Sequence, residues 1–90
     1  MAVTSSAPKQ GERIIARRGD DEVILLDPDT GNYYTLDDIG GRIWELCDGS
    51  RSPDEIAQVL SVEYEAPVDQ IRGDVNELLG ELRESRLVFD

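Results

Sequence analysis

The side chains able to do chemistry in this 90-residue chain are carboxylates and one thiol, because the chain has no histidine. The carboxylates include three close pairs, Asp20-Asp21, Asp27/Asp29 and Asp37-Asp38. Catalysis by two carboxyl groups needs a shared pocket that separates their pKa values. These pairs fall at expected turns and at an expected helix start, where water surrounds them. We therefore expect a protein that is not an enzyme.

Neither the thiol nor the acidic turn has the partners that a cofactor or metal site needs. Cys47 has no second cysteine in CxxC spacing and falls on the apolar face of an expected helix, which is typical of a buried structural cysteine. The segment 27–31 has the Asp-x-Asp-x-Gly start of a calcium loop. Asn32 and Asp38 stand where such a loop needs glycine and glutamate, which favours a plain turn. We predict no cofactor and no metal.

The charge balance excludes several classes of partner. Twenty acidic residues against nine basic ones give a net charge of −11. Residues 1–19 hold four basic residues and one acidic residue, which leaves −14 on residues 20–90. Such a body repels nucleic-acid phosphates and anionic membranes, and it attracts basic partners. We expect no nucleic acid and no membrane. The alternative that the charge only keeps the surface solvated stays open.

Length and composition indicate one small globular domain. No apolar run approaches the roughly 18 residues of a membrane span, and the first 19 residues lack the apolar stretch of a signal peptide. A single cysteine suits a reducing compartment, so we expect a cytoplasmic protein. Residues 1–11 hold little to bury, which predicts a disordered basic tail before a folded domain over residues 12–90.

Three strands are expected in the first half of the chain. Residues 13–18 and 22–27 are β-branched and apolar, and Gly19-Asp20-Asp21 separates them as a hairpin turn. The run 23–26 is apolar on both faces, which indicates a central strand at least partly covered on both sides. A turn at 27–31 leads into the strand 32–36. Its two tyrosines either pack across the sheet or form a docking edge for an added strand.

Three helices are expected after residue 36. Asp37 caps the first helix, and close approach to the sheet would explain the costly Gly40-Gly41 in its first turn. A capping box of Ser52 and Glu55 starts the second. The third spans about 67–85 with an acidic outer face, and 87–89 is a short apolar segment, a possible strand.

This order of strands and helices predicts an α+β fold. A winged helix-turn-helix DNA-binding protein has the same elements, but it needs a basic recognition helix, and the third helix here is acidic. An acidic carrier protein or another interaction module is the alternative. A carrier needs an exposed serine at a helix start for its phosphopantetheine arm. Ser50 is followed by Arg-Ser-Pro instead of the usual leucine.

One stretch of the chain contains sequence motifs that are more informative than its apolar periodicity. It contains the segments LDPDTG at 26–31, YYTLD at 33–37, IG at 39–40, IWEL at 43–46 and DG at 48–49. Together with the apolar rhythm that follows, these segments resemble the PqqD family over roughly residues 22–90. Asp37 stands where the family often has asparagine, and both residues cap helices.

The resemblance implies a winged helix-turn-helix-like fold of three antiparallel strands and three helices. It also implies a non-catalytic adaptor that binds the leader of a ribosomally made precursor peptide and delivers it to a modifying enzyme. That enzyme would be a radical-SAM protein in pyrroloquinoline quinone (PQQ) assembly, or a leader peptidase and cyclase in lasso-peptide assembly. We favour the lasso setting because discrete small members are common there. We expect a monomer or weak dimer, since an open edge invites pairing.

The resemblance further implies that the leader adds as a strand beside the third strand, against the third helix. By position, the strand residues are Asn32, Tyr33, Tyr34, Thr35 and Leu36. The helical wall would be Val68, Ile71, Arg72, Val75, Asn76 and Leu79. Since Tyr34 shares a strand face with Leu36, we expect it to lie nearer the helices than Tyr33. Arg72 would pair either with a leader carboxylate or with Asp69 or Asn76 on its own helix.

Overall fold

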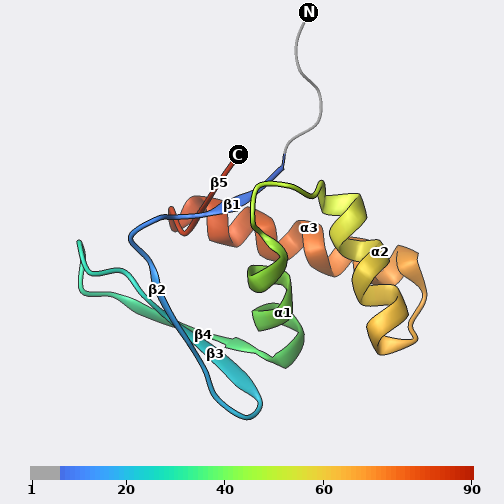
Figure 1. The fold of residues 1–90 in the computed structure, drawn as a ribbon, viewed down its shortest axis with the longest axis horizontal. Coiled ribbons are helices and arrows are strands. Elements are labelled where there is room, and N and C mark those ends of the chain that lie inside the picture. Colours follow the sequence, from blue (N-terminus) through green and yellow to red (C-terminus); the bar gives the residue numbers. More distant parts are fainter. Residues whose placement is uncertain (1–6) are drawn as a thin grey trace, which may run out of the picture.

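The computed structural model describes residues 7–90, and Figure 1 shows a strand meander followed by three helices. The strands of the meander are β2 (Ile15–Arg18), β3 (Glu22–Leu26) and β4 (Tyr33–Asp37). The helices are α1 (Asp38–Leu46), α2 (Pro53–Tyr64) and α3 (Val68–Glu84). Two short strands, β1 (Lys9–Gln10) and β5 (Val88–Phe89), pair with each other. The predicted α+β order of three antiparallel strands followed by three helices is confirmed.

Two tight turns fold the meander into one antiparallel sheet of order β2-β3-β4. In the first, the Gly19 N–H donates to the carbonyl of Glu22 at 2.8 Å. In the second, the Gly31 N–H donates to the carbonyl of Asp27 at 2.8 Å, and Gly31 has φ +79°, which glycine adopts at little steric cost. These turns make β3 the central strand and leave β2 and β4 at the edges.

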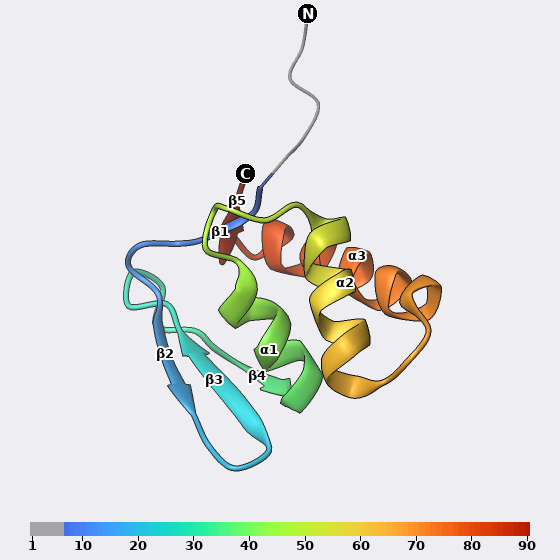
Figure 2. The same cartoon turned by 45° about the vertical axis from the view of Figure 1, so that its right-hand side comes forward.

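The helices cover only one face of the sheet, as Figure 2 shows for α1 against β3 and β4. Val23 and Leu25 of β3 are buried on this inner face, whereas Ile24 is 36% exposed on the outer face. Ile15 and Tyr33 lie on the outer face as well and are more exposed than Ile24. The helical core packs against the side of Val23 and Leu25, so the expected covering of residues 23–26 is complete only on this inner face. On the outer face, Ile24 is exposed and Leu26 is half-buried.

The predicted caps of the first two helices are confirmed by their hydrogen bonds. The Asp37 carboxylate accepts from the Gly40 N–H at 2.8 Å and caps α1. At α2, the Ser52 hydroxyl accepts from the Glu55 N–H at 3.2 Å, and the Glu55 carboxylate accepts from the Ser52 N–H at 2.8 Å. At α3, Pro67 is the N-cap and offers no side-chain bond. The core between the helices and the sheet contains Trp44, Ile43, Ile56, Leu60, Ile71, Val75, Leu79 and Leu82.

Residues 7–11 belong to the fold, which corrects the predicted disordered tail at its inner end. Pro8 is fully buried, and Lys9–Gln10 forms β1 against β5. The Gln10 N–H donates to the Cys47 carbonyl at 2.9 Å, and its side-chain amide donates to the Trp44 carbonyl at 2.8 Å. The ordered conformation of residues 7–11 comes from main-chain pairing with segments distant in the sequence, which the composition of residues 1–11 does not reveal. The rest of the predicted tail, residues 1–6, lies outside the described residues.

Candidate functional site

The outer edge of β4 offers unpaired main-chain groups to an additional strand. The Asp27 N–H donates to the Asn32 carbonyl at 2.9 Å next to the turn, and hydrogen-bonded pairs alternate along an antiparallel ladder. In the observed register, Tyr34 pairs with Leu25 in the hydrogen-bonded positions, and Thr35 lies opposite Ile24 in the others. The peptide groups of Tyr33 and Thr35 therefore face away from β3. No strand of residues 7–90 pairs with this edge.

Helix α3 lies beside this edge and forms two cavities with it. One has a volume of about 420 Å³, and the other of about 200 Å³. Thr35 and Leu36 of β4 and Leu78 and Glu81 of α3 line both, so the cavities are neighbours along one groove. We call this feature the β4–α3 groove. An open strand edge beside a helix is the geometry in which an extended peptide is bound by strand addition, with side-chain pockets setting specificity.

The two cavities differ in their chemistry. The larger one, the acidic cavity, is lined by carboxylates together with the apolar residues Leu36, Ile39, Ile43 and Leu78. The carboxylates are Asp37, Asp74, Glu77 and Glu81. The smaller one, the apolar cavity, has Glu81 as its only charged residue; its apolar and aromatic residues are Tyr34, Leu36, Leu78, Leu82 and Leu87. Neither cavity is lined by a lysine or an arginine.

Three of the five predicted strand residues line the groove. Tyr34 is half-buried against the core, whereas Tyr33 is 71% exposed on the outer face, so the expected order of the two tyrosines holds. Tyr34, Thr35 and Leu36 line the cavities. Asn32 precedes β4 and accepts the Asp27 N–H at the turn. Tyr33 contributes its outward peptide group and directs its side chain to the opposite face.

None of the six residues of the predicted helical wall lines either cavity. Ile71, Val75 and Leu79 are buried in the core at 2%, 0% and 0% exposure. Val68 packs partly buried against that core, and Asn76 is exposed outside the cavities. The apolar periodicity marks the stripe of α3 that packs on the protein's own core. The groove lies beside that stripe, on a neighbouring face of the helix.

The wall beside β4 consists of residues that the sequence reasoning missed, namely Asp74, Glu77, Leu78, Glu81, Leu82 and Ser85. Three of the six, Asp74, Leu78 and Glu81, directly precede a buried position of α3, and Leu82 is itself buried. Leu78 was the available signal in the sequence. It is an additional apolar residue beside Val75, Leu79 and Leu82, which already form the core-facing stripe.

Arg72 is tied to carboxylates of its own domain. Its guanidinium donates to Asp54 of α2 at 3.0 Å and to Asp69 of α3 at 2.7 Å. These two carboxylates raise the pKa of Arg72 above its usual value. The alternative of pairing with Asp69 on the same helix is therefore the observed one, with Asp54 as a second partner. Arg72 lines neither cavity of the groove.

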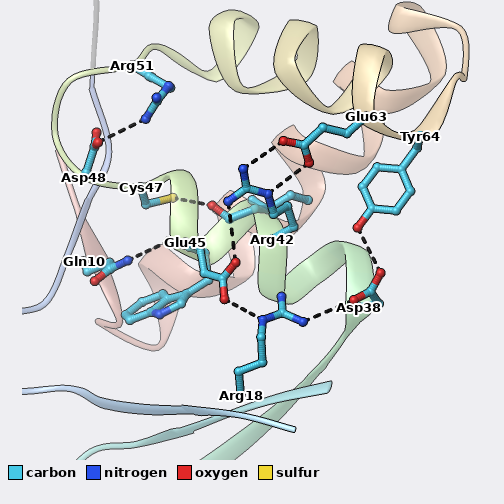
Figure 3. Close-up of polar contacts among 12 residues, drawn as sticks. Gln10, Arg18, Asp38, Arg42, Glu45, Cys47, Asp48, Arg51, Glu63 and Tyr64 are labelled. Carbon is cyan, nitrogen blue, oxygen red and sulfur yellow. Dashed lines mark hydrogen bonds and ion pairs between the residues drawn. The ribbon is translucent and has the colours of Figure 1, made fainter. Parts of the chain in front are cut away.

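A chain of polar contacts holds α1 between the sheet and α2, as Figure 3 shows. Arg18 of β2 donates to Glu45 at 2.7 Å and to Asp38 at 3.3 Å, both on α1. Arg42 of α1 forms a bidentate pair with Glu63 of α2 at 3.0 and 2.8 Å. This pair lowers the pKa of the Glu63 carboxyl below its ordinary value. The contacts help to fix α1, whose first residues also line the acidic cavity.

The thiol is structural, as the sequence predicts. Cys47 is fully buried, and its Sγ donates to the Ile43 carbonyl at 3.2 Å (Figure 3). Burial raises the pKa of the thiol to about 12, so it stays protonated at neutral pH.

The other candidate sites lie in turns and loops of the described residues. The Asp27 carboxylate accepts from the Asp29 N–H at 2.9 Å, as in a plain turn. No group of three or more metal-ligating side chains lies together within residues 7–90. Ser50 lies in a loop, with its hydroxyl 2.6 Å from the Asp48 carboxylate, rather than at a helix start. Among residues 7–90, no helix has the length and apolar character that crossing a membrane requires.

The fold and the groove define a class: a winged-helix-like α+β domain with an open strand edge beside an acidic helix. The family model described as "Coenzyme PQQ synthesis protein D (PqqD)" matches residues 22–88. The chain belongs to this family. It is 38% identical over 82 residues to a protein of Xanthomonas axonopodis pv. citri (strain 306) named PqqA binding protein, covering 91% of this chain and 87% of the relative.

Solved structures share the fold. A lasso peptide synthetase B1 complexed with its leader peptide superimposes with a TM-score of 0.80 at 26% identity, over 93% of this chain and 99% of that one. A PqqD truncation of Methylobacterium extorquens PqqCD superimposes with a TM-score of 0.77 at 26% identity, over 92% and 88%. The latter is described as a functional, stand-alone recognition element for ribosomally synthesised and post-translationally modified peptides (RiPPs). This chain has the fold of such recognition elements.

Proposed function

We propose that this chain is a non-catalytic adaptor that binds the leader of a ribosomally made precursor peptide. The leader adds to β4 as a fourth strand and lies in the β4–α3 groove. The observation that carries the proposal is the open edge at Tyr33 and Thr35 beside that groove, in a chain of the PqqD family. The relative named PqqA binding protein and the leader complex of the lasso synthetase B1 support the same reading.

The affinity has to come from both main-chain and side-chain contacts. Tyr33 and Thr35 together offer four main-chain hydrogen bonds, which contribute about 2–6 kcal/mol. Two apolar leader side chains buried in the groove add about 1.5–3 kcal/mol each. Association and ordering of a flexible leader cost several kcal/mol. Micromolar binding needs about −8 kcal/mol, so the cavities are as necessary as the edge.

The adaptor then delivers the bound precursor to a modifying enzyme. This is a leader peptidase and cyclase in a lasso-type pathway, which we favour, or a radical-SAM enzyme in PQQ assembly. The chain itself contributes no reacting group, in line with its buried, protonated thiol. Its part is to hold the leader so that the rest of the precursor reaches the enzyme.

Fluorescence anisotropy tests the binding step. The probes are labelled N-terminal halves of the short open reading frames next to the gene. One of them should bind with nanomolar to low-micromolar affinity, and Thr35→Pro should abolish binding because it removes an outward-facing N–H. Ala16→Pro is the matched control, since the Ala16 N–H faces outward at the opposite edge, on β2. Equal binding by both variants would refute strand addition to β4.

An activity assay tests delivery. A modifying enzyme encoded next to the gene should process the full precursor faster with the wild-type chain than with the Thr35→Pro variant. A precursor without its leader should not respond to the chain. Equal processing with the two variants would contradict the adaptor role.

A further inference from the structure

In the described part of the chain, the carboxylates of α3 in the groove are not paired with the protein's own cations. Asp74, Glu77 and Glu81 take part in none of the ion pairs found within residues 7–90. On the neighbouring surfaces, by contrast, Arg72 neutralises Asp54 and Asp69 and lines neither cavity. An extended ligand in the groove therefore meets acidic side chains that the protein itself leaves unneutralised.

These carboxylates follow the direction of the groove. Asp74, Glu77 and Glu81 are three and four positions apart, so they lie on one face of α3. The helical rise separates their backbones by about 4.5 and 6 Å. All three line the acidic cavity, where Leu36, Ile39, Ile43 and Leu78 form the apolar part of the surface. A cavity with apolar walls and a carboxylate rim suits a side chain with an aliphatic stem and a cationic end, which is lysine or arginine.

The apolar cavity lies one strand step away. Tyr34 lines it, and Leu36 lines both cavities. Tyr34 and Leu36 are two residues apart on the same strand face, about 6.8 Å. A strand added to β4 places every second side chain toward α3, one opposite each of these positions. Its two inward side chains therefore meet different chemistry, carboxylates at one position and an apolar pocket at the other.

We infer that the groove selects a peptide segment in which a lysine or arginine and a large apolar residue lie two positions apart. The inference rests on the proposed function and specifies the leader that the site accepts. The basic side chain occupies the acidic cavity against Asp74, Glu77 and Glu81. The apolar side chain occupies the cavity formed by Leu78, Leu82 and Leu87. The residue between them points away from α3 and is unrestricted by the groove.

Selection from a phage-displayed library of random 12-residue peptides tests this inference. The wild-type chain and Thr35→Pro are selected in parallel, and peptides enriched only on the wild type are counted as edge binders. We expect edge binders to carry a basic residue two positions from a large apolar residue. Edge binders without that pair would overturn the inference and leave the proposed function standing. A complete lack of edge binders would overturn both.

A charge exchange then assigns the basic position to the acidic cavity. One edge binder is synthesised with lysine or glutamate at the basic position, and anisotropy gives the two affinities. The glutamate peptide should bind the wild type at least about tenfold more weakly. Glu77→Lys should recover most of that loss. Glu84→Lys makes the same change in net charge on α3, outside both cavities, and should recover little. Equal recovery by both variants would show only a general charge effect and would refute the assignment.

Discussion

Gly41 of α1 lies directly against Val23 of β3. A β-carbon at position 41 would come within 2.9 Å of the Val23 Cβ, closer than real β-carbons approach other atoms. This relationship explains why the first turn of α1 carries glycine, although glycine costs about 1 kcal/mol in a helix. The close approach seats α1 on the inner face of the sheet.

Gly41→Ala should therefore destabilise the fold even though alanine is the better helix former. Forcing a methyl group against Val23 costs about 1–3 kcal/mol, and the gain in helix propensity offsets part of it. We expect a net loss of up to about 2 kcal/mol, which lowers Tm by several degrees for a domain of this size. Thermal denaturation followed by circular dichroism measures the change.

Gly73 of α3 provides the matched control. A β-carbon there meets no atom within 4 Å, and the residue is exposed. Gly73→Ala should stabilise the protein by up to about 1 kcal/mol. If both alanine variants raised Tm, the close packing of Gly41 on Val23 would be contradicted.

Leu78 and Leu79 are neighbours in sequence with different roles. Leu79 is buried in the core at 0% exposure, so Leu79→Ala should destabilise the fold by about 2–5 kcal/mol. Leu78 is half-buried and lines both cavities, so Leu78→Ala should mainly weaken leader binding. Urea denaturation and peptide anisotropy on both variants separate the effects. A folded Leu78→Ala variant with wild-type affinity would place the peptide elsewhere.

The pair of Arg42 and Glu63 gives stability a dependence on pH. Arg42 lowers the pKa of Glu63 in the folded state below the ordinary value of 4.5. The stabilisation is therefore present above the unfolded pKa and is lost as the pH falls through the folded pKa. Because both side chains are about one-third exposed, the contribution should not exceed about 1 kcal/mol.

Urea denaturation at pH 7 and pH 3 measures this contribution. Glu63→Gln should be slightly less stable than the wild type at pH 7, and the difference should shrink at pH 3. Glu84→Gln removes a carboxylate that makes no ion pair within residues 7–90, and it should not show this pattern. A Glu63→Gln difference that stays constant with pH would contradict the role of the pair.

Cys47 should be unreactive until the protein opens. Its burial and its pKa of about 12 leave almost no thiolate at neutral pH. A thiol reagent such as Ellman's reagent should modify the native protein at the rate of structural opening and the urea-unfolded protein at once. Rapid modification of the native protein would contradict the structural role.

Turn and cap residues made the element order predictable from the sequence, because their effects are local. Asp37 and Ser52 form the hydrogen bonds that their residue types favour. Gly31 adopts the positive φ that its turn requires. The ordered conformation of residues 7–11 was not predictable, because it depends on pairing with segments that come close only in the folded protein.

The strand side of the groove was predictable from the sequence, but its helical side was not. Alternation along β4 correctly separated Tyr34 from Tyr33. Periodicity on α3 found Val75 and Leu79, which face the core, because a buried stripe gives a strong apolar signal. A ligand groove beside that stripe is lined largely by exposed acids such as Glu77, which look like ordinary solvated residues in a sequence.

Amide hydrogen exchange on β4 tests the central claim most directly. In the free protein, the Tyr33 and Thr35 amides face the open edge, whereas those of Tyr34 and Leu36 bond to β3. With a saturating leader peptide, residue-resolved NMR should show strong slowing of exchange at Tyr33 and Thr35. Tyr34 and Leu36 provide the internal reference for a general change in stability. Unchanged exchange at Tyr33 and Thr35 in the fully bound protein would contradict strand addition to β4.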